Sequence, residues 1–241
     1  MFDPVNLLAI DTTFAACSVA VRSSCAINRT KVFSRAINMS SGHSEQVMDM
    51  IKTVLLDANM SLFDLDGVAV TTGPGSFTGT KIGIAVVRGL ALATGVSTFT
   101  ASSLAVIARR TLSRSKYVNS NYSSLPIAVC VDARRGQLYY QIFSFPGQTA
   151  LTPPSIGTIN DIASVISFKY KKVLLASHFG HDLVKSLNQS GVKTEDIFEP
   201  KLPSAKYLLD VDLKPVTKPC PLYLRPPDAK PQTSNKIKQI A

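Results

Sequence analysis

Residues 71–92 read TTGPGSFTGTKIGIAVVRGLAL and join the end of a strand, a glycine turn and an unusually apolar helix without a break. Just upstream, residues 67–70 form a short apolar run, which is typical of a strand buried on both faces. The turn Gly73-Pro74-Gly75 ends this strand, and either Ser76 or Thr78 can cap a helix over residues 79–93. The other elements of the chain are placed relative to this strand and helix.

The helix predicted over residues 79–93 contains Gly79, Gly83 and Gly89. Each glycine costs a helix about 1 kcal/mol relative to alanine, so a compensating reason is needed. Close approach of another backbone or helix supplies one, because a glycine has no side chain to keep a neighbour away. Only Lys81 and Arg88 are charged, so the helix is apolar nearly all round. It is therefore either a central core helix or a helix that another protein partly covers.

A second helix is predicted over residues 44–58, where Val47, Ile51 and Val54 begin a regular apolar face. Met48 and Met50 lie off that face and widen the apolar surface of the helix. Flexible thioethers can fill gaps in a core or adapt to a binding partner, and the pattern leaves both interpretations open.

Two similar hairpins are predicted in the two halves of the chain. The strand over residues 7–10 ends at Asp11, and residues 17–22 alternate as its returning strand. The strand over residues 127–131 ends at Asp132, and residues 138–145 return. The shared order of strand, aspartate, turn and strand predicts an internal repeat, with an acidic residue at the tip of each hairpin.

The polar loop over residues 113–124 marks the expected boundary between two lobes. Residues 1–112 are expected to form a first lobe with a central sheet and two interface helices, and residues 113–225 a reduced second lobe. Residues 226–241 are expected to be a disordered basic tail. Repeated prolines after residue 215 disfavour regular structure, although residues 223–225 can pack back on the body.

Composition limits the classes of protein to consider. The chain has 241 residues, 45% of them hydrophobic, which is ample for a packed core. No run approaches the roughly 20 apolar residues of a membrane span, and no signal peptide is recognisable. The four cysteines are scattered, which favours reduced thiols. We therefore expect a cytoplasmic location. The first 100 residues carry seven basic and seven acidic side chains, so the whole net charge of +10 lies beyond them. This excess indicates either a solvated basic surface or a surface that faces nucleic acid.

Catalytic motifs are poorly matched. The order Gly79-Thr80-Lys81 is not that of a P-loop, and Thr78 stands where a dinucleotide-binding motif has its third glycine. His43, His178 and His181 lack the spacing of a metal site. Asp11 and Asp132 resemble the paired acids of actin-like ATPases, but no glycine follows Asp11 in the turn over residues 12–16. We therefore predict no catalytic, cofactor-binding or metal-binding residue, and interpret these two aspartates as degenerate phosphate-loop positions.

Five runs carry a resemblance to a known family: GPGSFTGTKIGIAVVRGLA, LLAIDTT, HSEQ, VDARRGQLYY and PLYLRP. Together they resemble the TsaB (YeaZ) family of bacterial tRNA threonylcarbamoyladenosine modification, over most of residues 5–145 and again near residues 221–226. The resemblance implies an α/β, actin-like ATPase fold (ASKHA, ribonuclease H-like) with two lobes, the second reduced. It also implies a non-catalytic accessory subunit that forms a heterodimer with TsaD, with the ATPase TsaE as a third member.

The resemblance further implies that the helices over residues 44–58 and 79–93 pack against the partner, or against a second copy when the chain is alone. The expected interface residues are Val47, Met50, Ile51, Val54, Leu55, Gly83, Val86, Val87 and Leu90. ATP or ADP and a metal are expected on the TsaD-like subunit or at the interface. The complex then delivers threonylcarbamoyl to adenosine 37 of tRNAs that read ANN codons.

Two alternatives stay open at this point. One is an autonomous actin-like kinase or glycoprotease-type hydrolase. The other is a tRNA-binding module that uses the basic second half of the chain.

Overall fold

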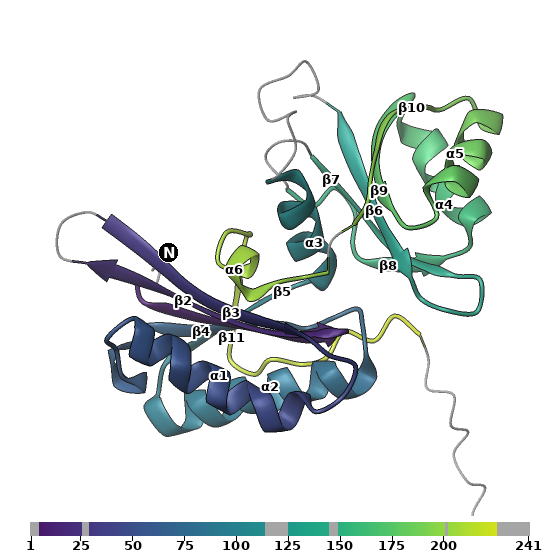
Figure 1. The fold of residues 1–241 in the computed structure, drawn as a ribbon. Coiled ribbons are helices and arrows are strands. Elements are labelled where there is room, and N and C mark those ends of the chain that lie inside the picture. The colour runs from purple at the N-terminus through teal and green to yellow at the C-terminus, as the bar shows by residue number, and fades with distance from the viewer. Residues whose placement is uncertain (1–4, 26–28, 114–124, 145–148, 201, 226–241) are drawn as a thin grey trace, which may run out of the picture.

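The computed structural model describes residues 5–25, 29–113, 125–144, 149–200 and 202–225. These residues form two lobes, each built on one β-sheet (Figure 1). The predicted tail, residues 226–241, and most of the predicted boundary loop, residues 114–124, lie outside the described residues.

The first lobe contains a six-stranded sheet in the order β11-β5-β4-β1-β2-β3. Strands β1, β2 and β3 form antiparallel hairpins, whereas β4 pairs parallel with β1 and with β5. Strands β1 and β4 are apolar and buried on both faces, as their composition predicts. The strands are β1 (Leu7–Phe14), β2 (Ala16–Cys25), β3 (Arg29–Asn38), β4 (Gly67–Thr71), β5 (Ser97–Ala101) and β11 (Lys214–Val216).

Helices α1 (His43–Asp57) and α2 (Phe77–Thr94) lie together on one face of this sheet (Figure 1). Their inner sides and the facing sheet residues form a continuous hydrophobic core. Ser76 is the N-cap of α2, because its hydroxyl accepts a hydrogen bond from the Gly79 amide. The sequence left Ser76 and Thr78 open as caps, and the structure assigns this role to Ser76.

The second lobe contains a five-stranded sheet in the order β10-β9-β6-β7-β8. Helices α4 (Ile159–Lys169) and α5 (Gly180–Gln189) cover one face of it and share its core. The strands are β6 (Pro126–Asp132), β7 (Leu138–Ser144), β8 (Ser155–Gly157), β9 (Lys172–Ser177) and β10 (Lys193–Phe198).

The two sheets repeat one topology. In each sheet a central strand pairs antiparallel with the next strand and parallel with a later one. In the first sheet β1 pairs with β2 and β4, and in the second β6 pairs with β7 and β9. The internal repeat predicted from the hairpins at Asp11 and Asp132 is confirmed in its order of strands. Only Asp132 ends its strand, because β1 continues through Asp11 to Phe14. The two-lobed α/β architecture that the resemblance implied is present in the described residues.

The structure assigns two segments differently from the expected lobes. Helix α3 (Ser103–Leu112) packs mainly against β6 and β7 of the second lobe, although Val106 also reaches the core of the first. Helix α6 (Ala205–Leu208) packs on β1 and β2, and β11 joins the first sheet. The end of the chain therefore returns to the first lobe, and Pro215 lies within an edge strand in spite of its missing N–H.

Among the described residues, no helix has both the length and the apolar character needed to cross a membrane. Cys17 and Cys130 are buried free thiols, and Cys220 is an exposed one.

Candidate functional site

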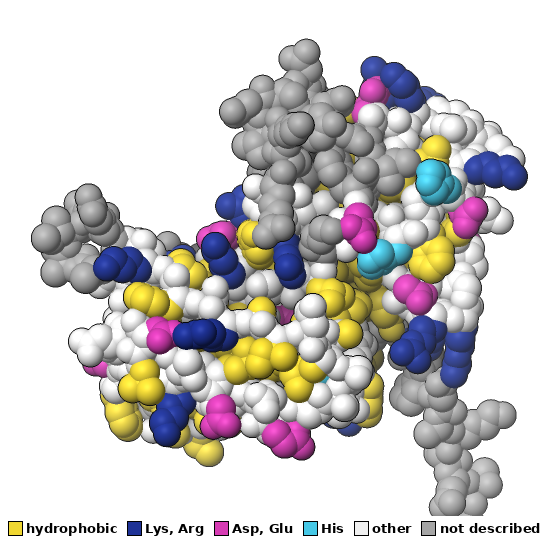
Figure 2. All heavy atoms as spheres, viewed as in Figure 1, with side chains coloured by type: hydrophobic (Ala, Val, Ile, Leu, Met, Phe, Trp, Pro, Cys, Tyr) yellow, Lys and Arg dark blue, Asp and Glu magenta, His cyan; other side chains and the backbone are white. Residues whose placement is uncertain are grey.

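The outer face of α1 and α2 carries apolar side chains that the chain itself leaves uncovered. Leu92 is 89% exposed and Phe77 60% exposed on α2, and Leu56 is 69% exposed on α1. Met48 on α1 is also exposed. Figure 2 shows patches of hydrophobic side chains on the lobe that carries these helices. Because large apolar side chains that cluster on a surface mark sites of interaction, this outer face is the first candidate site.

Small residues form a stripe along the same face of α2. Ala85, Gly89 and Ala93 are four residues apart and exposed. Outside the backbone of its own helix turn, a Cβ atom added at Gly89 would meet no atom of the described residues within 4 Å. Packing within the chain therefore does not require this glycine, although it lies well inside the helix.

The two other glycines of α2 have reasons within the chain. A Cβ at Gly79 would lie 2.0 Å from the Thr12 carbonyl oxygen, and one at Gly83 would lie 2.6 Å from Thr12 Oγ1. Gly75, in the turn before α2, has the same role, because a Cβ there would lie 2.2 Å from the Thr13 carbonyl oxygen. These three glycines allow the start of α2 to lie directly against the β1–β2 hairpin.

Asp11 is fully buried at this contact. Thr71 donates a hydrogen bond to Oδ2 of Asp11, and the Thr13 amide donates to Oδ1 at 3.2 Å. Burial raises the pKa of the Asp11 carboxyl, while these hydrogen bonds and the nearby His43 act in the opposite direction. The Ser76 amide also donates to the Thr13 carbonyl at 2.6 Å. The carboxylate that resembled a phosphate-loop acid is therefore used in joining β1 to β4, and the backbone of Thr13 joins this site to the start of α2.

Asp132 lies in a different environment at the end of β6. It is exposed and accepts a hydrogen bond of 2.7 Å from the Arg134 amide. The turn that follows has three successive residues with positive φ: Arg134 at 63°, Arg135 at 58° and Gly136 at 69°. Two non-glycine residues in this region make the turn a strained one.

A cleft of about 660 Å³ lies between the two lobes. Phe14 and His43 line it from the first lobe, and Asp132, Arg134 and His178 line it from the second. His43 is buried, with Nε2 3.2 Å from the Phe14 carbonyl oxygen, whereas His178 is exposed. Within the described part of the chain, no three His, Cys, Asp or Glu side chains form a group that could hold a metal ion.

A family model described as TsaD, tRNA N6-adenosine threonylcarbamoyltransferase, matches residues 37–198, which is more than half of the chain. The chain belongs to this family. Within it, curated relatives place the chain in the TsaB/YeaZ group. A protein of Buchnera aphidicola subsp. Schizaphis graminum named tRNA threonylcarbamoyladenosine biosynthesis protein TsaB is 34% identical over 134 residues, 56% of this chain and 58% of the relative. The Escherichia coli protein of the same name is 30% identical over 137 residues, 56% of this chain and 54% of the relative.

The match to these two TsaB relatives thus spans a little over half of their length. The fold extends further than the sequence similarity. The solved structure of YeaZ from Pseudomonas aeruginosa matches 91% of this chain and 99% of its own, with a TM-score of 0.70 and 24% identity. The TsaB/YeaZ fold therefore includes the second lobe, where the sequence patterns were weakest.

The expected interface residues of this TsaB/YeaZ chain need a correction. Their side chains point into the core between the helices and the sheet, except for Val86, which is half-buried, and Gly83, whose backbone is buried against Thr12. As an exposed contact set the prediction was wrong, because the regular apolar face of each helix is the one that packs on its own sheet. The corrected positions are Val47, Met50, Ile51, Val54, Leu55, Gly83, Val87 and Leu90. That the two helices bind a partner stays a prediction.

Three residues at the start of α2 and beside it, Phe77, Lys81 and Tyr223, were not predicted as site residues. Phe77 stacks on Tyr223, with ring centroids 5.3 Å apart, and the Lys81 ammonium lies 3.7 Å from the centroid of the Phe77 ring. The prolines on either side of residues 222–225 had indicated only that this segment can pack on the body. Its contact with the start of α2 depends on tertiary structure, which no local pattern predicts.

Proposed function

We propose that this chain is a non-catalytic subunit in tRNA threonylcarbamoyladenosine biosynthesis, and that it acts by pairing with a TsaD-like catalytic subunit. Its TsaB relatives are named for this biosynthesis, and the family model that it matches describes the threonylcarbamoyltransferase. In this proposal the complex transfers threonylcarbamoyl to adenosine 37 of tRNAs that read ANN codons. The tRNA contacts the complex, and a TsaE-like ATPase is its third member.

The outer face of α1 and α2 is the proposed pairing surface, and Gly89 is the observation that carries the proposal. A glycine inside a helix costs about 1 kcal/mol, and nothing in the described chain lies near enough to require it. A partner helix that crosses at the Ala85-Gly89-Ala93 stripe would gain close backbone approach. Leu92 and Phe77 would then be covered from outside.

The environment of Asp11 supports a non-catalytic role. Thr71 and Thr13 already occupy its carboxylate oxygens, and burial favours the neutral form. Phe14 and Ala15, rather than glycines, line the cleft at the hairpin turn. These residues do not fit a nucleotide phosphate or its metal ion. We therefore assign ATP or ADP and the metal to the TsaD-like subunit or to the interface with it.

The test is a substitution on the outer face. Gly89→Glu places a charge where a Cβ has free space, so the chain is expected to fold normally and to lose the TsaD-like subunit on co-purification. The matched control is Ser164→Glu, at an exposed position of α4 in the second lobe. Mass spectrometry of tRNA nucleosides after replacement of the wild-type gene is expected to show loss of threonylcarbamoyladenosine with Gly89→Glu only.

Two outcomes would contradict the proposal. If the folded Gly89→Glu variant still co-purified with the TsaD-like subunit, the outer face of α1 and α2 would not be the pairing surface. If the threonylcarbamoyladenosine content of tRNA were unchanged after depletion of the wild-type protein, the proposed function would be wrong.

In the absence of the partner, the same face is expected to form a homodimer. Analytical ultracentrifugation of Gly89→Glu would test this expectation, because the variant should then be a monomer.

A further inference from the structure

The last described segment, residues 214–225, runs across the molecule, and we call it the strap. It begins as β11, which pairs antiparallel with β5, and continues alongside α2 (Figure 1). In its middle the Leu222 amide donates a 2.7 Å hydrogen bond to the Thr72 carbonyl. It ends at the second lobe with Arg225. The strap therefore has contacts at both ends and near its centre.

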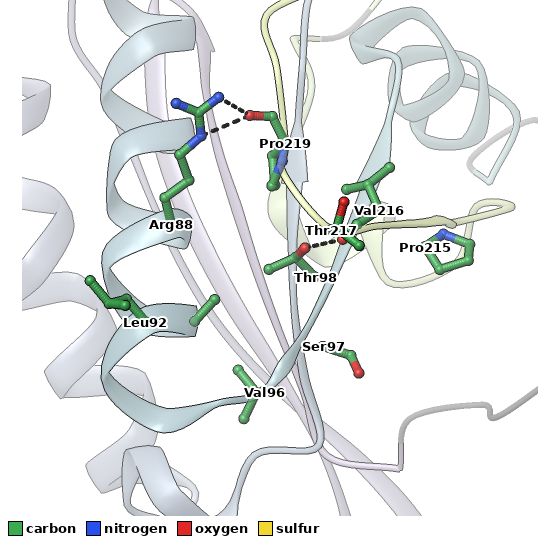
Figure 3. Close-up of a pocket in the computed structure, with 10 residues that line it drawn as sticks. Arg88, Leu92, Val96, Ser97, Thr98, Pro215, Val216, Thr217 and Pro219 are labelled. Carbon is green, nitrogen blue, oxygen red and sulfur yellow. Dashed lines mark hydrogen bonds between the residues drawn. The ribbon is translucent and has the colours of Figure 1, made fainter.

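The first part of the strap forms one wall of a groove of about 660 Å³ beside α2 (Figure 3). Val216 and Pro219 face Leu92 and Val96 across it. Arg88 holds the strap in place, since both Nε, at 2.9 Å, and Nη2 donate to the Pro219 carbonyl oxygen. Arg88 thus joins this wall to α2, while the pairing of β11 with β5 and a hydrogen bond from Thr98 to the Val216 carbonyl join it to the sheet.

The central part of the strap lies against the start of α2. Gly73 has φ of 103°, and a Cβ there would lie 3.2 Å from the Leu222 carbonyl oxygen, so the turn before α2 also lies close to the strap. One residue later Tyr223 stacks on Phe77, which belongs to the outer face of α2. The strap is therefore continuous with the proposed pairing surface.

The far end of the strap contacts the β6–β7 turn. Nη2 of Arg225 donates to Gln137 Oε1 at 2.7 Å and to the Arg134 carbonyl oxygen at 3.3 Å. Arg225 also lines the interlobe cleft, together with Arg134 and Asp132. One segment consequently borders both the groove beside α2 and the cleft between the lobes.

We propose that the strap couples the groove and outer face of α2 to the opening of the interlobe cleft. Prolines 215, 219 and 221 fix φ along the segment, so a displacement at Pro219 is transmitted toward Arg225 rather than absorbed locally. A subunit bound at Phe77 and Leu92 would touch the strap and change the angle between the lobes. The coupling itself does not depend on the proposed function. Only the claim that a bound TsaD-like subunit moves the strap rests on the proposed pairing.

The experiment measures the interlobe distance in the full-length chain without a TsaD-like subunit, and labelled chain is diluted with unlabelled chain so that a homodimer carries only one labelled protomer. Nitroxide labels on p-acetylphenylalanine at Lys52 of α1 and Lys185 of α5, both exposed, report on the two lobes by pulsed electron paramagnetic resonance without changes to the cysteines. Arg225→Ala removes both hydrogen bonds to the second lobe, and Gln137→Ala removes the shorter of the two. Both are expected to replace a narrow distance distribution with a broader one.

Arg88→Ala is the decisive variant, because Arg88 lies in the first lobe and does not line the cleft. Coupling through the strap predicts that it also broadens the interlobe distribution. The matched control is Arg35→Ala, which breaks an exposed ion pair with Asp57 inside the first lobe and is expected to leave the distribution unchanged. Thermal unfolding of each variant verifies that the fold is intact.

Three results would overturn the coupling. They are a wild-type distribution in Arg88→Ala, broadening that occurs with Arg225→Ala alone, and equal broadening in the Arg35→Ala control. None of them depends on a partner subunit. A failure of the proposed pairing would appear only in co-purification, so the two failures are distinguishable.

Discussion

Gly83 and Gly89 lie six residues apart on α2 and face different surroundings: a Cβ at Gly83 would lie 2.6 Å from Thr12 Oγ1, whereas one at Gly89 would meet no atom within 4 Å. One glycine is explained by the chain's own packing, and the other is not. This difference separates the contribution of α2 to the fold from its proposed contribution to pairing.

Alanine at these two glycines is expected to act in opposite directions on the isolated chain. Gly89→Ala raises the free energy of unfolding by about 1 kcal/mol, through helix propensity alone. Gly83→Ala lowers it by about 1–3 kcal/mol, because Thr12 must move and lose its 2.7 Å hydrogen bond to the Gly79 carbonyl. Urea unfolding of the two variants measures both values. A destabilised Gly89→Ala would show that the glycine has a role inside the chain.

Acidic substitutions at Val54 and Val87 are expected to destroy the fold rather than a contact with a partner. Both side chains are fully buried in the core beneath α1 and α2. An unpaired charge there costs more than about 4 kcal/mol, which is a large part of the stability of a domain. Circular dichroism and solubility of Val54→Asp and Val87→Glu measure the loss. Met48→Asp on the exposed side of α1 is the control, and unfolding of that variant would contradict the assignment of faces.

Asp11 is expected to make stability depend on pH. Burial raises its folded-state pKa above the ordinary value of 3.8, so the folded protein holds this proton more tightly than the unfolded chain does. The associated stability is present below pH 3.8 and is lost as the pH rises through the folded-state pKa. The stability of wild type relative to Asp11→Asn should therefore fall as the pH rises. Urea midpoints of both proteins over a pH series measure this trend, and a constant difference would refute it.

Calorimetric titration of magnesium ATP into the isolated chain is expected to give no binding heat. The oxygens of Asp11 are already engaged, and the β1–β2 turn carries Phe14 and Ala15 where a phosphate would need open backbone. The same titration with the TsaD-like subunit present is expected to show binding. Saturable binding to the chain alone would favour the autonomous kinase or hydrolase.

Local sequence patterns predicted the elements whose burial follows a simple period. The apolar positions of α1 and the short apolar runs of β1, β4 and β6 face the interior. Asp132 ends β6 as predicted, but the prediction was wrong for Asp11, because β1 continues beyond it to Phe14. Strand β5, STFTA, was missed because it alternates polar and apolar residues over only five positions. Strand β11 was missed because Pro215 disfavours a strand unless the strand lies at an edge.

The candidate site was harder to predict for a related reason. Periodicity identifies the face of a helix that is buried, and on α1 and α2 that face packs on the chain's own sheet. The exposed residues that are available to a partner, such as Leu92 and Gly89, lie outside this apolar periodicity. Likewise, Asp11 and Asp132 occupy similar places in the two sequence patterns, yet one is buried and the other exposed. Asp11 lies inside β1 beside Thr71 of β4, whereas Asp132 is the last residue of β6.

The position of β11 in the chain determines when the first lobe can be finished. Strand β5 pairs with β4 on one side and receives its second neighbour from residues 214–216, which a ribosome synthesises after the entire second sheet. During translation the nascent first sheet thus has an open edge at β5 until the second lobe has emerged. The first sheet can therefore be completed only after the second lobe has been synthesised.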